Sequence, residues 1–202
     1  MKILLTGFEP FGGEAINPAL ESVKQLHGTT IAGAEVTSLE LPVSWENALP
    51  KVIAAINELS PDVVVSVGQA GGRAKVTPEY VGINTMNGKD NYEVQKKDHR
   101  IDPDGVDGHF STLPVLQMVS AMQAAGIPAA VSYTAGTYLC NYLAYSVPHY
   151  IIGNKLPIKA GFIHIPFLPE QANTKPAATP SLPLATIVDG LRECIRVIAE
   201  QA

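Results

Sequence analysis

Short apolar runs alternate with helix-like stretches along the whole chain. Residues 2–8 form a mainly apolar run that is typical of a buried strand. Asn17 and Pro18 come next, a residue type that caps helices followed by one that suits the first helical position. The valine-rich residues 63–67 are apolar on both faces, as in a central strand of a parallel sheet. The pattern predicts an α/β fold in which helices cover both faces of a mostly parallel sheet.

Most of the remaining residues also fall into expected strands or helices. The expected strands are residues 2–8, 35–43, 63–67, 76–84, 128–137 and 159–167. The expected helices are residues 18–26, 44–59, 111–126, 138–152 and 181–199. Polar residues 85–109 should form a functional loop or an irregular hairpin, and proline-rich residues 168–183 should form a loop. Because no repeat or linker interrupts the alternation, we expect a single domain over residues 1–202.

Composition and charge narrow the class of protein. The hydrophobic content of 46% and charged content of 16% fit an ordinary globular chain that needs neither a disulfide nor a metal for stability. A net charge of −5 without a basic stretch argues against a nucleic-acid partner. No segment approaches the ~20 apolar residues of a membrane span. Since the N-terminal apolar run is too short for an export signal, we expect a cytoplasmic protein with reduced cysteines.

The first strand ends in a glycine loop, TGFEPFGG, at residues 6–13. Gly7 and Gly12 have the spacing of a phosphate-binding loop. Gly13 and Glu14, however, stand where that motif requires Lys followed by Ser or Thr. The G-x-G spacing of dinucleotide-binding loops is also absent. The loop therefore argues against nucleotide binding, and we expect no cofactor.

Cys140 is the candidate nucleophile. It follows a strand end and turn, TAGT at residues 134–137, where a helix is expected to begin. A helix N-terminus favours negative charge, which should lower the pKa of the thiol, and its free N–H groups can hold an oxyanion. The alternative is a thiol that only packs in the core, which is the interpretation we prefer for Cys194 in the final helix.

A cysteine nucleophile needs a histidine that carries protons. His164 is the candidate among five histidines because it lies near the carboxyl end of the apolar strand 159–167, towards the same rim as Cys140. The alternative is a buried structural histidine. A carboxylate should then hold the imidazole tautomer. Glu79, in an apolar stretch beside Tyr80, is the acid least suited to a solvated surface, although an edge-strand glutamate facing water is the alternative.

Several segments together match one family. In chain order they are TGFEPFGG with Asn17-Pro18, VGQAGGR at 67–73, TPEYVGIN at 77–84, FSTLP at 110–114, SYTAGTYLCN at 132–141 and GFIHIPFLPEQ at 161–171. In this combination, which covers essentially the whole chain, the sequence resembles the pyrrolidone-carboxylate peptidases, also called pyroglutamyl peptidases type I. The resemblance implies a three-layer α/β/α sandwich with a mostly parallel, twisted sheet. It also implies an enzyme that removes an N-terminal pyroglutamyl residue from peptides.

The resemblance further implies roles for particular residues. It assigns a catalytic triad to Cys140, His164 and Glu79. The residues that it assigns to the substrate pocket are Phe8, Phe11, Asn17, Gln69 and Tyr138. It implies a cytoplasmic homo-oligomer, a tetramer or a dimer, that acts on peptides and binds neither nucleic acid nor membrane. No Cys/His cluster has metal-ligand spacing, so no metal is expected.

Two other functions stay open from the sequence. A different thiol hydrolase on the same scaffold would hydrolyse ordinary amides and leave a pyroglutamyl-arylamide untouched. A catalytically silent ligand-binding α/β domain would have a Cys140 that labels no faster than a free thiol at neutral pH.

Overall fold

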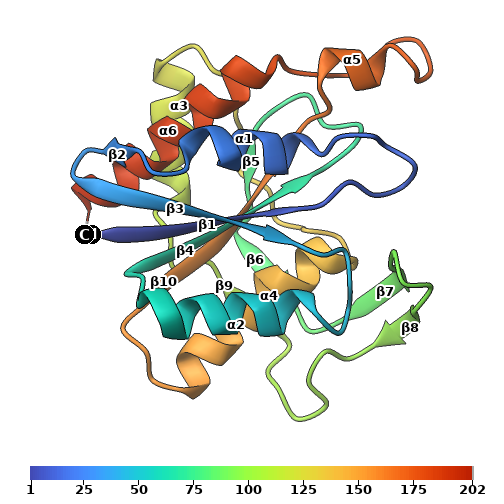
Figure 1. Cartoon of the computed structure of the whole chain (residues 1–202), viewed down its shortest axis with the longest axis vertical. Coiled ribbons are helices and arrows are strands. Elements are labelled where there is room, and N and C mark those ends of the chain that lie inside the picture. The colour runs from blue at the N-terminus through green and yellow to red at the C-terminus, as the bar shows by residue number, and fades with distance from the viewer. Residues whose placement is uncertain (202) are drawn as a thin grey trace.

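A twisted sheet forms the centre of the computed structural model, which describes residues 1–201 (Figure 1). Its strands lie in the order β2-β3-β1-β4-β10-β5. Their bounds are β1 (Lys2–Phe8), β2 (Thr30–Ile31), β3 (Ala34–Leu41), β4 (Val63–Gln69), β5 (Thr77–Pro78) and β10 (Lys159–Ile165). The strands β3, β1, β4 and β10 are parallel, while the short β2 and β5 pair antiparallel at the two edges.

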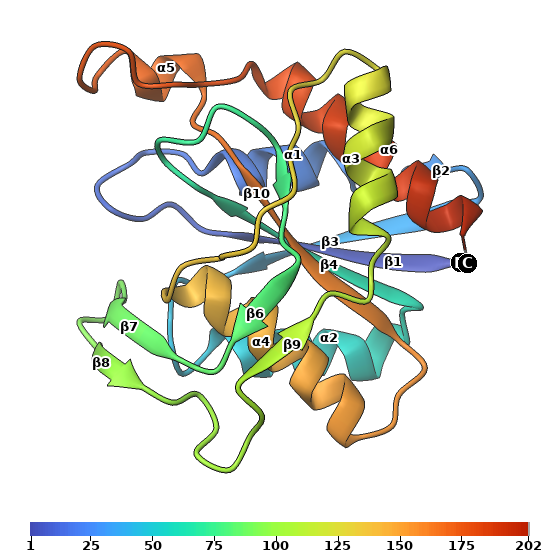
Figure 2. The same ribbon diagram turned by 180° about the vertical axis from the view of Figure 1, so that it is seen from behind.

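Helices cover both faces of this sheet. They are α1 (Pro18–Leu26), α2 (Ala48–Leu59), α3 (Val115–Ala124), α4 (Leu139–Gly153), α5 (Pro169–Ala172) and α6 (Leu184–Glu200). Successive side chains of a strand point to opposite faces. In β1, Ile3 and Leu5 therefore pack with α1, α3 and α6, whereas Leu4 and Phe8 pack with α2 and α4. Figures 1 and 2 show the two helical layers on either side of the sheet, so the predicted α/β/α sandwich is confirmed.

The expected strand 76–84 is divided into two parts. Its second half, β6 (Val81–Ile83), leaves the main sheet and pairs antiparallel with β9 (Gly108–Phe110). The Asn141 side chain of α4 completes this strand: Oδ1 accepts from the Ile83 N–H at 2.9 Å and Nδ2 donates to the Ile83 carbonyl at 2.8 Å. A buried amide from a distant helix thus takes the place of a neighbouring strand.

Residues 85–109 contain a hairpin, one of the two predicted forms. Its strands are β7 (Met86–Lys89) and β8 (Gln95–His99), which pair antiparallel. The turn between them is organised by the buried Asp90, whose Oδ1 accepts from the N–H groups of Tyr92 and Val94, both at 2.9 Å. Asp90 Oδ2 accepts from the Trp45 N–H at 2.9 Å, so one carboxylate joins the hairpin to the start of α2.

Other boundaries also differ from the predictions. Residues 128–137 make only isolated parallel bridges with residues 76–79 instead of a regular strand, because that partner segment is itself short and irregular. The helices α2, α3 and α6 begin later than predicted. Ser44 and Ser111 are involved in the turns that precede α2 and α3, where their Oγ atoms accept backbone N–H groups. Ser181 instead bridges Phe167, and the short α5 lies within the predicted proline-rich loop.

No helix within residues 1–201 has both the length and the apolar character that a membrane span requires.

Candidate active site

The carboxyl ends of the parallel strands bring the candidate residues to one edge of the sheet. Phe8 ends β1, Gly68 lies near the end of β4, and His164 lies near the end of β10. The strand register pairs His164 with Gly68. Because neighbouring strands are about 4.8 Å apart, these two residues are immediate neighbours.

Gly68 leaves space for the thiol of Cys140. A Cβ atom on Gly68 would lie 2.8 Å from Cys140 Sγ and 2.7 Å from the Phe162 ring. Phe162 and His164 are two residues apart on β10, so both side chains point to the sheet face that α4 covers. Their ring centroids are 4.9 Å apart. The absence of a side chain at Gly68 therefore allows Cys140 Sγ to lie on the same face as His164, beside the neighbouring strand.

Cys140 is the second residue of α4, whose N-cap is the extended Tyr138. The Tyr138 side chain makes no capping hydrogen bond to this helix end, so the N–H groups of its first turn can bind an anion. A turn precedes the helix, in which Gly136 has a positive φ of 74°. The predicted position of the cysteine at a helix start is therefore correct.

Glu79 is the partner of His164. Its carboxylate Oε1 accepts a hydrogen bond from His164 Nδ1 at 2.7 Å, and its side chain is only 1% exposed. The backbone N–H of Glu79 donates to the Phe162 carbonyl at 2.8 Å, which ties the acid to β10. The alternative of a solvated edge glutamate is therefore wrong. With Nδ1 bonded to a carboxylate, Nε2 is the free basic nitrogen of the imidazole.

Burial determines the resting protonation of Cys140 and His164. Cys140 is half-buried as a residue, but Sγ lies against Gly68, and burial raises the pKa of the thiol to about 12 with help from the Glu79 charge. The predicted lowering of this pKa by the helix N-terminus is wrong, because lost hydration outweighs it. Burial also lowers the pKa of His164 against the opposing effect of Glu79. The resting pair is thus a neutral thiol and a neutral imidazole.

The rate of Cys140 alkylation should therefore rise steadily with pH. With iodoacetamide we expect an increase from about pH 6 to about pH 10, without a plateau near neutrality, because the thiolate fraction keeps growing below a pKa of about 12. Peptide mapping by mass spectrometry measures the labelling at each pH. The buried Cys194, whose thiol pKa burial also raises, is the internal comparison and should label only after unfolding. A rate plateau below about pH 8 would instead indicate a preformed thiolate. With a thiol pKa of about 12, slow labelling at neutral pH does not distinguish the enzyme from a silent ligand-binding domain, so substrate turnover makes that distinction.

Three aromatic rings lie near the same end of the sheet. Phe8 is buried with the residues of α2 and α4, and the Phe11 ring is 6.4 Å from the Tyr138 ring. The Tyr138 hydroxyl donates to the Lys89 carbonyl at 2.8 Å, which joins this residue to β7. The sequence analysis missed Trp45, whose ring meets Tyr138 edge-on at 5.4 Å.

The side-chain amides of Asn17 and Gln69, which were predicted to line the pocket, form hydrogen bonds with other groups of the protein. Asn17 is 1% exposed; its Oδ1 accepts from the Ala19 N–H at 3.0 Å and its Nδ2 donates to the Glu9 carbonyl at 3.1 Å. Asn17 thus caps α1 and anchors the glycine loop. Gln69 Oε1 accepts from Nε2 of the buried Gln171 at 3.0 Å, a contact that the sequence analysis also missed.

The comparisons with known proteins decide the family. A family model described as pyroglutamyl peptidase matches residues 1–201. The chain belongs to the pyroglutamyl peptidase family. It is therefore a cysteine-type hydrolase that acts on peptide bonds, as predicted.

Relatives of this chain match it over nearly its whole length. It is 46% identical over 202 residues to pyrrolidone-carboxylate peptidase 2 of Caldanaerobacter subterraneus subsp. tengcongensis, covering 99% of this chain and 97% of the relative. It is 48% identical over 204 residues to a pyrrolidone-carboxylate peptidase of Lacticaseibacillus paracasei, covering 100% and 94%.

Solved structures of similar proteins have the same fold. The crystal structure of pyroglutamyl peptidase I from Bacillus amyloliquefaciens superposes with a TM-score of 0.94 at 41% identity, covering 98% of this chain and 94% of that one. A mutant pyrrolidone carboxyl peptidase from Pyrococcus furiosus gives a TM-score of 0.96 at 35% identity, covering 100% and 99%.

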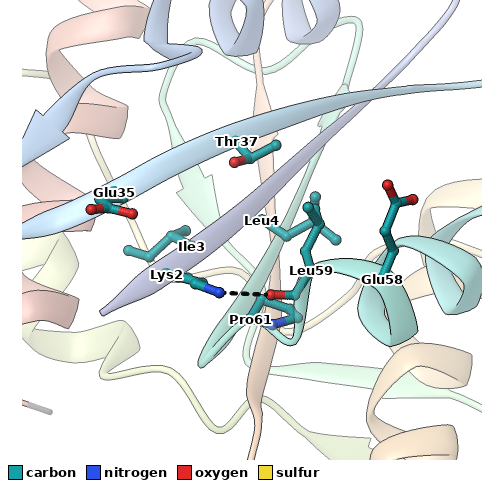
Figure 3. Close-up of a pocket in the computed structure, with 8 residues that line it drawn as sticks. All are labelled: Lys2, Ile3, Leu4, Glu35, Thr37, Glu58, Leu59 and Pro61. Atoms are coloured by element: carbon teal, nitrogen blue, oxygen red, sulfur yellow. Dashed lines mark hydrogen bonds between the residues drawn. The ribbon is translucent and has the colours of Figure 1, made fainter.

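A hollow in the surface lies at the opposite end of the strands from the candidate active site. Figure 3 shows its lining, which includes the first residues of β1 and the end of α2. Lys2 Nζ donates to the Leu59 carbonyl at 3.2 Å, and the Lys2 N–H donates to Asp62 Oδ2 at 2.7 Å. A cation bonded to a carbonyl at a helix C-terminus stabilises that helix end. We therefore assign this hollow a structural function.

The sequence analysis also missed Arg73, the basic residue of the VGQAGGR segment. Its Nη1 donates to Glu79 Oε1 at 2.7 Å. An arginine after a glycine loop looks like a solvated residue in the sequence. The available indication was Glu79 itself, since a buried carboxylate needs partners. Within residues 1–201, no group of three or more His, Cys, Asp or Glu side chains is arranged to hold a metal ion.

Proposed function

We propose that this enzyme removes an N-terminal pyroglutamyl residue by acyl transfer to Cys140, with His164 as proton carrier and Glu79 as the group that orients it. One observation carries the proposal: the buried His164–Glu79 bond of 2.7 Å lies beside Gly68, over which the Cys140 Sγ is placed. A nucleophile, a base and an orienting acid thus share one edge of the sheet. That is the arrangement that acyl transfer requires.

The aromatic side chains near the candidate active site suit the substrate. A pyroglutamyl ring is small, flat and uncharged, so it favours apolar surroundings and hydrogen bonds to backbone groups. Phe8, Phe11 and Tyr138 supply such surroundings. Burial raises the pKa of Tyr138 to about 12, so its hydroxyl stays neutral. Asn17 contributes by anchoring the glycine loop that carries Phe8 and Phe11. Gln69 contributes by accepting from Gln171, whose amide also donates to Glu14.

The first half of the reaction forms a thioester. Cys140 Sγ attacks the carbonyl carbon of the pyroglutamyl residue while His164 Nε2 takes the thiol proton. A C–S bond forms, and the carbonyl π electrons become an oxyanion beside the N–H of Cys140 at the start of α4. The oxyanion then collapses, the C–N bond breaks, and His164 gives its proton to the leaving amine. Glu79 stabilises the imidazolium between these steps.

The second half regenerates the enzyme. Water attacks the thioester carbon, and His164 Nε2 takes a proton from that water. Cys140 leaves as a thiolate and receives this proton back. The products are free pyroglutamate and a neutral thiol–imidazole pair, which matches the resting protonation that burial favours.

A substrate panel tests this function. We expect pyroglutamyl-arylamide to be hydrolysed with a kcat/KM at least about 10²-fold above that of prolyl-arylamide, because the pocket must bind the lactam carbonyl that proline lacks. Release of the arylamine is followed by fluorescence. Preferential turnover of prolyl-arylamide would indicate a different thiol hydrolase. No turnover of either compound would indicate a ligand-binding domain.

We further propose that residues 1–202 form a single catalytic domain of a cytoplasmic homo-oligomer, a tetramer or a dimer. The free thiols Cys140 and Cys194 fit a reducing compartment. An aromatic patch supports association: the Tyr80 ring packs against Phe110 at 5.6 Å and against Tyr133 at 5.5 Å. Phe110 and Tyr133 are 68% and 67% exposed, and clustered exposed rings mark interaction surfaces.

The double substitution Phe110→Ser with Tyr133→Ser should yield a smaller particle. Removing both exposed rings deletes apolar area that a second copy would bury, and light scattering after size exclusion measures the mass. Tyr92→Ser is the matched control, because Tyr92 is 57% exposed at the hairpin turn away from this patch. An unchanged mass for the double variant would place the interface elsewhere.

A further inference from the structure

Three segments of the candidate active site meet at the Arg73 side chain. Its Nη1 donates to Thr77 Oγ1 at 2.6 Å and to Glu79 Oε1 at 2.7 Å, and its Nη2 donates to the Thr134 carbonyl at 2.9 Å. Thr77 lies in β5, next to the triad acid. Thr134 lies in the turn that leads to Cys140 and α4. Arg73 thus joins the loop after β4 to the segments that carry Glu79 and Cys140.

Arg73 and His164 share one oxygen of Glu79. Both His164 Nδ1 and Arg73 Nη1 lie 2.7 Å from Oε1. The other oxygen, Oε2, is buried and has no hydrogen-bond partner among the described residues. The side chain of Glu79 is 1% exposed and that of Arg73 is 26% exposed, so the ion pair is poorly screened by water. The arginine charge therefore acts strongly on the Glu79–His164 pair.

A permanent positive charge at this position opposes the binding of a further proton. Burial lowers the pKa of His164, the Glu79 carboxylate raises it, and the Arg73 charge lowers it further. Arg73 compensates the Glu79 carboxylate and at the same time repels an imidazolium. Both effects favour the unprotonated imidazole. Catalysis needs the pair without this proton, because His164 must accept one from Cys140.

We propose that Arg73 is a positioning residue, an inference that rests on the proposed function: it fixes Glu79 relative to the start of α4 and keeps His164 unprotonated in the resting enzyme. Arg73 acts through Glu79 and is not assigned a contact with the substrate. Its loss should therefore change how the rate depends on pH and leave substrate binding nearly unchanged.

Two substitutions separate the charge from the hydrogen bonds. Arg73→Gln keeps an amide donor but removes the charge, so the acid limb of the kcat/KM profile should move upward by at least about 0.5 pH unit. Arg73→Lys keeps the charge, so its midpoint should stay within about 0.2 unit of wild type even if kcat falls. In both variants KM for pyroglutamyl-arylamide should change by less than about twofold.

A second measurement does not depend on turnover. NMR follows the ring signals of His164 during a pH titration of two proteins, Cys140→Ala and the double variant Cys140→Ala with Arg73→Gln. The titration midpoint of His164 should be higher in the double variant, by the same amount as the shift of the acid limb of the kcat/KM profile. Equal His164 midpoints in these two proteins would overturn the proposal. Equal shifts of the acid limb of the kcat/KM profile for Arg73→Gln and Arg73→Lys would also overturn it. Wild-type turnover by Cys140→Ala would instead overturn the proposed function, while the NMR titration would still decide the effect of Arg73.

Discussion

Replacing Cys140 with alanine should lower kcat/KM for a pyroglutamyl-arylamide by at least about 10⁴-fold. The proposed reaction forms its C–S bond through this sulfur, and the only other described thiol, Cys194, is buried between helices with Sγ 3.7 Å from Met122 Sδ. Binding and oxyanion stabilisation would survive the change, so a small residual rate over water is expected. Fluorescence of the released arylamine measures the loss.

Cys194→Ala is the matched control for this prediction. It removes the same thiol group from the core of the opposite helical layer, so stability should fall slightly while kcat/KM stays near wild type. Cys140→Ser adds a second comparison with the same shape and a much weaker nucleophile, and it should also lose nearly all activity. Activity of Cys140→Ala above about a tenth of wild type would mean that the nucleophile lies elsewhere.

The second large effect is expected from Gly68→Ala, a change of one methyl group. The new Cβ would lie 2.8 Å from Cys140 Sγ and 2.7 Å from the Phe162 ring, which is too close for either contact. Because the sulfur must shift, we expect kcat/KM to fall by about 10²-fold, the loss that a misplacement of about 1 Å can cause. Overpacking should also cost about 1–3 kcal/mol of unfolding free energy.

The control for Gly68→Ala is the same substitution at Gly153. A Cβ there would meet nothing within 4 Å, and the residue ends α4, the helix that carries Cys140. Gly153→Ala should leave both activity and thermal stability close to wild type. Thermal melts of both variants show whether a loss of activity comes from a less stable fold or from a displaced Cys140 in a folded protein. Wild-type kcat/KM in Gly68→Ala would show that Phe162 and Cys140 yield without disturbing the site.

The sequence was sufficient to predict which groups meet at the site. Cys140, His164 and Glu79 are far apart along the chain. Cys140 was expected at the start of a helix and His164 near the end of a strand, while Glu79 was the acid least suited to a solvated surface. In an open sheet of parallel strands such ends lie on one edge. The valine-rich β4 and the alternation with helices implied that sheet. The expected positions of Cys140 and His164 followed from local patterns and from this one topological rule, whereas the triad as a set was implied by the resemblance to the family.

The sequence could not predict the partners that those groups use. Arg73 lies six residues before Glu79, but only the path through β5 brings its guanidinium back to the acid and to the Thr134 carbonyl. The contact of Gln171 with Gln69 spans 102 residues. Contacts of this kind depend on the final packing of loops, about which local propensity says little.

The glycine loop TGFEPFGG illustrates what the sequence reveals and what only the tertiary structure reveals. Its residue types by themselves argued against a phosphate site, because no lysine or hydroxyl follows the second glycine. Only the tertiary structure shows why the loop carries a glutamate: Glu9 Oε1 accepts from the Val43 N–H at 2.9 Å and from Asn91 Nδ2 at 3.2 Å. It anchors two distant segments beside the loop.

The sequence by itself determined the fold class and the edge of the sheet that carries the candidate chemistry, because periodicity and strand ends are local properties of the chain. The candidate triad was assigned through the resemblance of the sequence segments to one family. The tertiary structure decided the protonation of Cys140 and His164. Burial against Gly68 outweighs the helix N-terminus and keeps Cys140 a thiol, while the shared Glu79 oxygen links His164 to Arg73. Hydration and charge compensation depend on which distant groups surround an atom, and only the folded chain brings those groups together.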